Sequence, residues 1–507
     1  METNKWNVAK EDEEMSYLMF VENLHFTIQK IFMTATNKIL FISIFIGLFF
    51  TNHNLKAQMT YTMPAEDLQH EGTWLQWPHH FEYGITYSNR LDTTWVAMTA
   101  ALVSSEKVHI IAYNSTEQTR ITSLLTAANV SMTNVDFKLF QTNDVWVRDN
   151  GPIFVRDTSG NLVIEDWGFN GWGGDYNFNL CNSIPTNVGS AIGTTVVNLN
   201  LIMTCEGGSV EQDGHGVFMA TKSSILSQSN PSGIHSIRNS GMSQAQAEAI
   251  FTQYLGVTKF IWLNGGFSVD DVTDMHIDGF AKFMNDSTIV TMNNTDLTYW
   301  GVTSADITTL NTATNINNHP YNFVQLPLTA NDVVTTYGNN LGFKGSYINY
   351  YVANTVVLVP NYNDTNDGVA NNIIQGLYPT RTVVGIDVRN PYENGGMVHC
   401  VTQQQPIAVV ATGLIQTNLN EIKMTLVFPN PASDHATIEF ELLEAGHIAL
   451  ELFNSARQLV VTITNSELQK GKHSFTINTS KFSNGLYTYS LRRGNSATTH
   501  KELLIVK

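Results

Sequence analysis

Short hydrophobic runs alternate with amphipathic stretches along the middle of the chain, from about residue 59 to residue 412. The runs are rich in β-branched residues, which favours strands, and the stretches between them carry apolar residues at helical spacing. The expected strands are Lys107–Tyr113, Thr195–Asn200, Lys259–Leu263, Thr288–Met292, Thr355–Pro360 and Thr382–Val388. The expected helices are Thr94–Ser105, Ser115–Ala128, Ser243–Gly256 and Gly368–Pro379.

One strand–helix–strand unit recurs at intervals of some tens of residues. Alternation of this kind predicts an α/β fold. Recurrence of a single unit suggests repeats arranged around a centre, where loops from different repeats converge.

The pattern changes over the last part of the chain. After an expected linker at residues 413–425, hydrophobic and polar residues alternate with a period of two through residues 426–507. Turn residues separate these runs at short intervals, which predicts a small all-β sandwich. A carbohydrate-binding or adhesion module is an alternative use for such a domain.

A mostly apolar run, Ile39–Phe50, follows Lys38 near the start. At twelve residues it is shorter than the ~20 needed to span a bilayer. A charged residue, an apolar run and the small residue Ala57 together predict a signal peptide at residues 33–57, cleaved before Gln58. We interpret residues 1–32 as an over-extended gene start, and a membrane anchor is the alternative. No stable membrane span is expected.

The composition is that of a globular protein, with 43% hydrophobic and 14% charged residues. The net charge of −17 makes nucleic acid an unsuitable partner and suits cationic ligands. Three cysteines, Cys181, Cys205 and Cys400, exclude a disulfide scaffold. The first two would be able to pair in an exported protein. No cysteine or histidine cluster has zinc spacing.

Four polar segments each lie where an apolar run meets a glycine-rich turn: Asn143–Val155, Cys205–Gly216, Asp270–Phe280 and Asn394–Pro406. Loops at strand ends often gather binding groups. Taken singly, each has an ordinary structural explanation: an Asx turn at Asp149, a solvated turn at Glu206, a core histidine at His276, a surface acid at Asp278 and a buried thiol at Cys400.

Taken together, the same residues fit one kind of chemistry. A free cysteine and a histidine form a nucleophile and its acid/base partner. Several carboxylates near a thiol raise its pKa unless the substrate brings a positive charge. A guanidinium is a planar cation whose N–H groups pair with carboxylates. We therefore expect a guanidinium-binding site with an attacking sulfur.

Six segments resemble, in order, the motifs of the agmatine deiminase and Porphyromonas-type peptidylarginine deiminase family. They span about residues 63–406 and read "MPAEDLQHEGTWLQWPH", "WVRDNGP", "FNGWGG", "CEGGSVEQDG", "HIDGF" and "GGMVHCVTQQQP". The resemblance implies the pentein fold, an α/β-propeller of ββαβ repeats in a pseudo-fivefold array. This agrees with the recurring unit described above.

The resemblance also implies a role for each matching residue. The reacting set is Cys400 as nucleophile, His276 as general acid and base, Asp149 and Asp278 as the guanidinium clamp, and Glu206 as the acid that orients the histidine. Trp146 and Trp172 are expected to bind substrate. The implied reaction forms a thiouronium on Cys400, releases ammonia and ends in a ureido product, with no metal or organic cofactor. Met397 stands where a smaller residue is common and is expected to reshape the substrate entrance.

The last domain resembles the C-terminal sorting domain of type IX secretion in Bacteroidetes, with "VFPNPASDHATIEF", "LFNSARQLV" and "NGLYTYSLR". The secretion machinery is then a partner, and the protein is secreted or held at the cell surface. Two substrates remain open. The segment after "FNGWGG" offers no Arg or Lys, which favours agmatine, a precursor of putrescine, over an arginine in a protein. A surface adhesin on an inactive scaffold is the non-enzymatic alternative.

Overall fold

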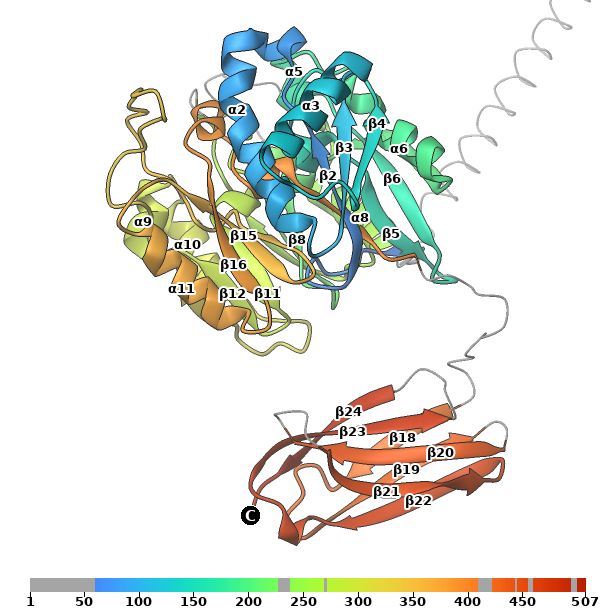
Figure 1. Cartoon of the computed structure of the whole chain (residues 1–507). Coiled ribbons are helices and arrows are strands. Elements are labelled where there is room, and N and C mark those ends of the chain that lie inside the picture. The colour runs from blue at the N-terminus through green and yellow to red at the C-terminus, as the bar shows by residue number, and fades with distance from the viewer. Residues whose placement is uncertain are drawn as a thin grey trace, which may run out of the picture. The chain divides into compact units, whose positions relative to one another are not determined.

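The structure is a computed structural model that describes residues 60–226, 238–268, 271–408, 422–442, 445–454, 459–493 and 499–507. The chain divides into two compact units, Met1–Ile407 and Ala408–Lys507 (Figure 1). The proposed gene-start segment, 1–32, and the signal peptide, 33–57, lie outside the described residues, as does most of the expected linker, 413–425.

Five mixed β-sheets make up the described part of the first unit, and they share one connectivity. An antiparallel pair of strands is followed by a helical connection and then by a strand that pairs in parallel. Two sheets have four strands each: one in the order β17 (Gln403–Pro406), β2 (His70–Gln76), β3 (Lys107–Ala112) and β4 (Val135–Leu139), the other in the order β1 (Tyr61–Thr62), β5 (Ile153–Asp157), β6 (Leu162–Gly168) and β7 (Thr195–Thr204). Two sheets of three strands follow: β10 (Lys259–Leu263), β9 (Val217–Thr221) and β8 (Val210–Gln212), and then β11 (Ala281–Asn285), β12 (Thr288–Thr291) and β13 (Asn322–Gln325). The fifth sheet has β14 (Tyr351–Val352), β15 (Val356–Asn361) and β16 (Thr382–Asp387).

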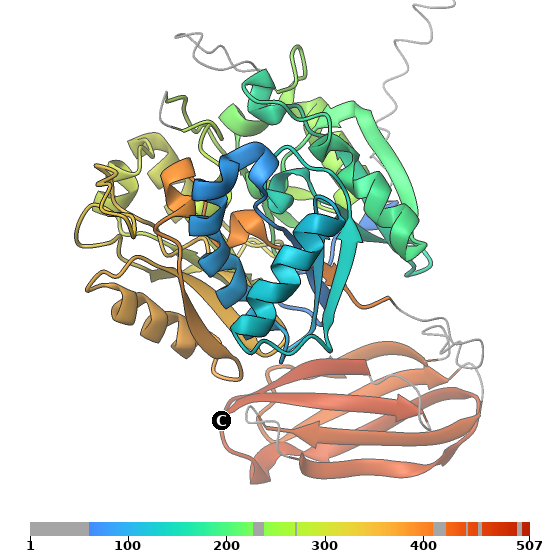
Figure 2. The same cartoon turned by 45° about the horizontal axis from the view of Figure 1, so that its top comes forward.

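Helices connect the parallel strands, as the alternation in the sequence predicts. They are α2 (His80–Leu102), α3 (Ser115–Ala127), α6 (Ile184–Ile192), α8 (Gln244–Leu255), α9 (Asn294–Tyr299), α10 (Ser304–Asn311) and α11 (Asp367–Leu377). The α/β class is therefore confirmed for this unit. Figures 1 and 2 show α2 and α3 side by side, on the sheet that contains β3.

Helix α2 begins well before the predicted start at Thr94, because tertiary contacts hold its weak first half. This half contains a kink at Gly84, whose φ is +68°. Its buried Asp92 accepts hydrogen bonds from Trp77 Nε1 at 2.7 Å and from Arg120 Nη1 at 2.5 Å. No periodicity in the local sequence signals these partners, so the helix looked shorter in the sequence.

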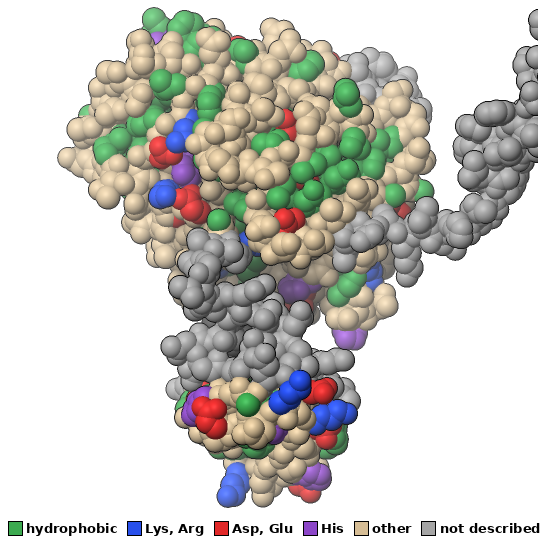
Figure 3. Space-filling view, turned by 90° about the vertical axis from the view of Figure 1, so that its right-hand side faces the viewer, with side chains coloured by type: hydrophobic (Ala, Val, Ile, Leu, Met, Phe, Trp, Pro, Cys, Tyr) green, Lys and Arg blue, Asp and Glu red, His purple; other side chains and the backbone are tan. Residues whose placement is uncertain are grey.

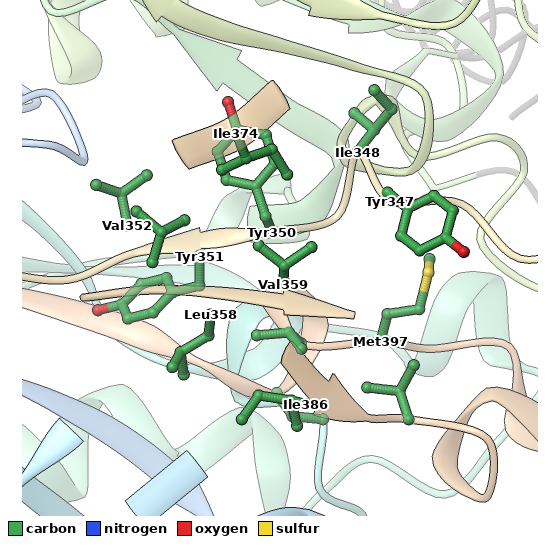
Figure 4. Close-up of a cluster of buried hydrophobic side chains, with 14 of the residues drawn as sticks. Tyr347, Ile348, Tyr350, Tyr351, Val352, Leu358, Val359, Ile374, Ile386 and Met397 are labelled. Carbon is green, nitrogen blue, oxygen red and sulfur yellow. The ribbon is translucent and has the colours of Figure 1, made fainter. Parts of the chain in front are cut away.

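The largest hydrophobic core lies around β14 and β15 and includes Tyr347, Tyr350 and Tyr351, all fully buried (Figure 4). Met397 belongs to this core, is 3% exposed and receives the Tyr362 hydroxyl on its sulfur at 2.9 Å. The expectation that Met397 reshapes the substrate entrance was wrong, because its side chain fills a gap in the core.

Strand β17 brings the end of the first unit back to its beginning. It pairs antiparallel with β2, with Gln403 opposite Trp74. The two strands are joined by side chains as well, because Trp74 Nε1 donates to Gln405 Oε1 at 2.8 Å. This pairing fixes the segment immediately before β17, which contains Cys400.

The second unit is all-β, as its alternating pattern predicts. Its two antiparallel sheets are β18 (Ile422–Phe428), β19 (His435–Leu442) and β22 (Gly471–Asn478), and β21 (Leu459–Leu468), β20 (Gly446–Phe453), β23 (Gly485–Arg493) and β24 (Thr499–Ile505). One core contains residues from both sheets, among them Phe440, Leu450 and Leu503. Along β19, buried and outward residues alternate over most of the strand, which is the signature of one face in a core.

Neutral polar groups and backbone cover most of the face of the first unit drawn in Figure 3, with few charged side chains between them. Among the helices of the described residues, none is both long and apolar enough to cross a membrane.

Truncation of a core aromatic residue tests the packing of the first unit. Phe251 of α8 is fully buried and lies 4.5 Å, ring to ring, from Phe218. Phe251→Ala should lower the free energy of unfolding by about 3–5 kcal/mol because it leaves a cavity. Phe81→Ala, at a 63% exposed position, should cost about 1 kcal/mol or less. Equal losses in urea unfolding of the two variants would contradict this core.

Candidate active site

The predicted reactive residues all lie in short helical turns next to strands. Asp149 is in α4 (Val147–Asn150), and Glu206 precedes η2 (Gly207–Ser209) at the end of β7. His276 and Asp278 flank the start of η3 (Ile277–Gly279), and Cys400 lies in η5 (His399–Val401) before β17. Turn α4 contacts both η2 and η5, and η2 contacts η3, so four distant segments meet.

Gly208 marks the point on which three of these side chains converge. A Cβ atom at Gly208 would lie 2.7 Å from Asp149 Oδ1, 2.7 Å from His276 Nδ1 and 3.1 Å from Asp278 Oδ2. Only a glycine leaves room for the acids and the histidine to approach each other here. Sequence reasoning missed Gly208, although the paired glycines of "CEGGSV" were a signal for close approach.

Cys400, the expected nucleophile, is partly exposed, whereas Cys181 and Cys205 are buried. Its Sγ lies 3.9 Å from Asp278 Oδ2. Asn349 Nδ2 donates to the same sulfur at 3.4 Å, and Asn349 Oδ1 accepts from the backbone N–H of His399 at 2.9 Å. Asn349 therefore fixes the turn that presents the thiol. No motif in its local sequence indicated this role.

Glu206 orients the histidine. Its Oε2 lies 2.9 Å from His276 Nε2, and its Oε1 accepts from Arg238 Nε at 3.0 Å. Arg238 also forms an ion pair with Asp274. Glu206 and Arg238 have fully buried side chains, so each neutralises a charge that the interior would otherwise penalise. Arg238 was not identified from the sequence, because nothing near it in the chain shows its partner.

The two tryptophans occupy different places. Trp172 is 5% exposed, and its Nε1 donates to Asp149 Oδ2 at 2.9 Å, so it holds a clamp carboxylate. Its φ of +56° is rare for a residue other than glycine and marks a tightly constrained turn. Trp146 is half-buried against Phe169 and Trp172. A Cβ at Gly396 would lie 1.9 Å from the Trp146 ring, so the glycines before Cys400 allow this ring to approach.

The electrostatics of the site depend on burial and on the proximity of the acids. Burial is the main cause that raises the pKa of Asp149 to about 6. Glu206 and Asp278 raise this pKa further, and His276 opposes the shift by lowering it. Burial lowers the pKa of His276, but Asp149, Glu206 and Asp278 together outweigh it and bring it to about 9. The pKa of Asp278 is lowered from its ordinary value. Burial alone would raise it, but the hydrogen bond and charge of His399, together with His276 and Arg148, outweigh burial.

Burial raises the pKa of the Cys400 thiol well above its ordinary value, and Asp278 and Asp149 raise it further. This is the effect that the sequence predicted for a thiol among carboxylates. A bound guanidinium would offset both acids and so favour the thiolate.

No group of three or more His, Cys, Asp or Glu side chains in the described part of the chain is arranged to hold a metal ion. The two buried cysteines are both free thiols and belong to different hydrophobic clusters.

The comparisons agree with this geometry. Residues 62–406 match the family model of Porphyromonas-type peptidyl-arginine deiminase, and residues 426–507 match that of the secretion system C-terminal sorting domain. An agmatine deiminase of Pseudomonas fluorescens (strain SBW25) is 28% identical over 381 residues, which cover 70% of this chain and 98% of that protein.

Solved structures support the same fold. A proposed arginine deiminase from Porphyromonas gingivalis aligns with a TM-score of 0.59 and 29% identity, covering 68% of this chain and 98% of that one. An agmatine deiminase of Enterococcus faecalis aligns with a TM-score of 0.59 and 22% identity over 69% of this chain and 98% of that one. The first unit thus has the pentein fold, with mixed sheets. On the family match over most of its length, the chain belongs to the Porphyromonas-type peptidyl-arginine deiminase family, with a secretion sorting domain over residues 426–507.

Proposed function

We propose that this protein is an exported deiminase that converts agmatine to N-carbamoylputrescine and ammonia. Its family makes it a guanidine deiminase, and its sorting domain directs it through type IX secretion to the cell surface or beyond. The observation that carries the proposal is the convergence of Asp149, His276 and Asp278 on Gly208, with the Cys400 sulfur 3.9 Å from Asp278.

Binding comes first in the proposed mechanism. The carboxylates of Asp149 and Asp278 accept hydrogen bonds from the guanidinium N–H groups and neutralise its charge. Because the cation offsets both acids, the Cys400 thiol gives its proton to solvent when the substrate is bound. The nucleophile is thus activated only in the presence of a cationic substrate.

Two chemical steps follow. The Cys400 thiolate attacks the guanidinium carbon, and His276 gives a proton to the departing nitrogen, which leaves as ammonia. The covalent thiouronium remains. His276, now neutral, takes a proton from water as its oxygen attacks the same carbon. The carbon–sulfur bond breaks as the new hydroxyl gives its proton to solvent and becomes the carbonyl, which regenerates the Cys400 thiolate and releases the ureido product.

The charges around the site favour agmatine, which has no carboxylate. Among the described residues, three cationic side chains near this region each have a carboxylate neighbour: Arg238 has Glu206, Lys282 has Glu66 and Glu211, and Arg148 has Glu66 at 3.7 Å, beyond hydrogen-bond distance. The segment that follows Trp172, residues 175–183, contains no Lys or Arg. A C-terminal arginine would bring a carboxylate that these cations are not free to bind.

Peptidyl-arginine is the second candidate, and export is the observation that favours it, because proteins are available outside the cell. An inactive adhesin is the weakest candidate, since both the nucleophile and its acid/base partner are present at Cys400 and His276.

We further propose that the five sheets surround a pseudo-fivefold axis, as the blades of a propeller. Their common connectivity and the closing pair β17–β2 support this arrangement. The proposed organisation is a signal peptide at 33–57, a catalytic domain at 59–412, a linker at 413–425 and a sorting domain at 426–507.

Replacement of the nucleophile is the first test. Cys400→Ser should abolish ureido formation without changing the melting temperature, because a hydroxyl does not ionise in this site as a thiol does. Iodoacetamide should label Cys400 before Cys181 or Cys205, which are 0% and 2% exposed. Full activity of the serine variant, or labelling of Cys181 first, would remove Cys400 from the mechanism.

The pH dependence of kcat/KM follows from the raised pKa values of Asp149 and His276. Activity should rise with pH as Asp149, with a pKa of about 6, ionises and becomes able to bind the guanidinium. It should fall as His276, with a pKa of about 9, loses the proton that ammonia release requires. Asp149→Asn should remove the rise of kcat/KM at low pH. It should also shift the fall of kcat/KM at high pH to a lower pH, because Asp149 is the acid that most raises the pKa of His276.

Asp166→Asn is the matched control for that experiment. Asp166 is also a buried acid, 2% exposed, but its carboxylate accepts from Thr186 Oγ1 and its backbone carbonyl accepts from Asn200 Nδ2. Both limbs should stay in place in this variant. The assignment fails if the Asp149 variant keeps the wild-type profile.

The substrate test uses a shortened chain of residues 58–420, which should keep full deiminase activity because every reactive residue lies in the first unit. Agmatine should be processed faster than a peptide that ends in arginine. A kcat/KM for the peptide about tenfold higher than for agmatine, or about 1.4 kcal/mol in transition-state binding, would favour peptidyl-arginine. Deletion of residues 426–507 should leave the protein in the periplasm.

A further inference from the structure

His399, the residue before Cys400, joins the guanidinium clamp to the N-terminal motif of the chain. Its Nδ1 lies 2.8 Å from Asp278 Oδ2, and its Nε2 lies 2.7 Å from Glu66 Oε2. The ring is 2% exposed. The mechanism described above uses Asp278 but assigns no part to His399 or to Glu66.

The surroundings of His399 are a buried set of alternating charges. Lys282 Nζ lies 3.1 Å from Glu66 Oε2, 3.2 Å from Glu211 Oε1 and 3.2 Å from His399 Nε2. The Arg148 guanidinium lies 3.7 Å from Glu66, and its Nε donates to the His399 carbonyl at 3.3 Å.

Three carboxylates, from Asp278, Glu66 and Glu211, therefore face the cations of Lys282 and Arg148. Each ring nitrogen of His399 faces one of these carboxylates, Nδ1 that of Asp278 and Nε2 that of Glu66, so the ring bridges the two acids.

The contact between His399 and Asp278 has a direct consequence at the thiol. Oδ2 of Asp278 is the atom that faces His399, and the same atom lies 3.9 Å from Cys400 Sγ. A donor at this oxygen fixes the carboxylate and withdraws part of its charge from the sulfur. Without it, the carboxylate would be free to turn, and its full charge would oppose the thiolate.

Resting on the proposed function, we propose that His399, held by Glu66, is a positioning residue that orients the Asp278 carboxylate toward the substrate guanidinium and offsets its charge beside the Cys400 sulfur. Glu66 lies in the "MPAEDL" segment, far from Cys400 in the sequence. The proposal thus gives that segment a part in the reaction.

Two amide substitutions at position 399 separate this role from simple packing. The amide nitrogen of asparagine can occupy the place of Nδ1, whereas that of glutamine can reach only the place of Nε2. His399→Asn should therefore keep the donor to Asp278, and His399→Gln should lose it. The readouts are the rate of Cys400 alkylation by iodoacetamide at pH 8 and the steady-state constants with agmatine.

His399→Gln should be alkylated about tenfold more slowly, the effect of one unit in the thiol pKa. Its kcat/KM should fall about 100-fold, with kcat lower and KM higher, because the clamp is misplaced. His399→Asn should stay within about threefold of the wild type in alkylation. If the substitution only loosened the packing, alkylation of Cys400 would become faster and not slower, because the thiol would be more exposed.

His109→Gln is the matched control, because His109 is also buried and also lies between two carboxylates, Glu71 at 2.8 Å and Asp136 at 3.1 Å. It should change the melting temperature only. Equal alkylation rates in the two variants at position 399, or faster alkylation of the glutamine variant, would overturn the proposal. Alkylation needs no substrate, so this test stands even if agmatine proves not to be the substrate.

Discussion

The burial of several carboxylates around a single thiol is the constraint on which this structure depends. Asp149, Asp278 and Glu206 are all nearly inaccessible to water, and Cys400 lies among them. Acids in such a position raise the pKa of the thiol that must attack. The conflict is resolved only by a substrate that is itself a cation. Substrate selection and nucleophile activation are therefore the same electrostatic event.

The interior tolerates these acids because other charges compensate them. Arg238 neutralises Glu206, and His399 Nδ1 lies 2.8 Å from the Asp278 carboxylate. His276 Nδ1 lies 3.6 Å from Asp149 Oδ1, and Asp149 accepts hydrogen bonds from Trp172 Nε1 and the backbone N–H of Gly208. It is thus the acid with the raised pKa and the one that most benefits from a bound guanidinium.

The pentein architecture makes this arrangement possible by bringing strand ends together. Each reactive turn adjoins a different strand, and rigid sheets hold the turns in place. The pairing of β17 with β2 brings Cys400 to the N-terminal strand, and the ion pairs of Glu66 add a second connection there. The residues that match the sorting domain form a separate unit with its own core.

The sequence by itself determined the α/β class of the first unit and the all-β second unit, and it predicted a set of reactive residues. Strands such as Lys259–Leu263 are continuous apolar runs between turn residues, and local pattern suffices to find them. The reactive residues stood out because Asp149, Glu206, His276, Asp278 and Cys400 are a chemically coherent set in glycine-rich turns.

Only the tertiary structure decided which other residues contact and position the predicted reactive residues. Asn349, Arg238, Glu66 and His399 act through partners that lie far away in the chain, as in the 333 positions between Glu66 and His399. Met397 looked like an entrance residue and proved to be core, since burial depends on neighbours from other strands. The local sequence shows the type of each side chain and the spacing of the hydrophobic residues. It does not show which distant charged residue will pair with a buried charge, because the packing of the sheets decides that contact.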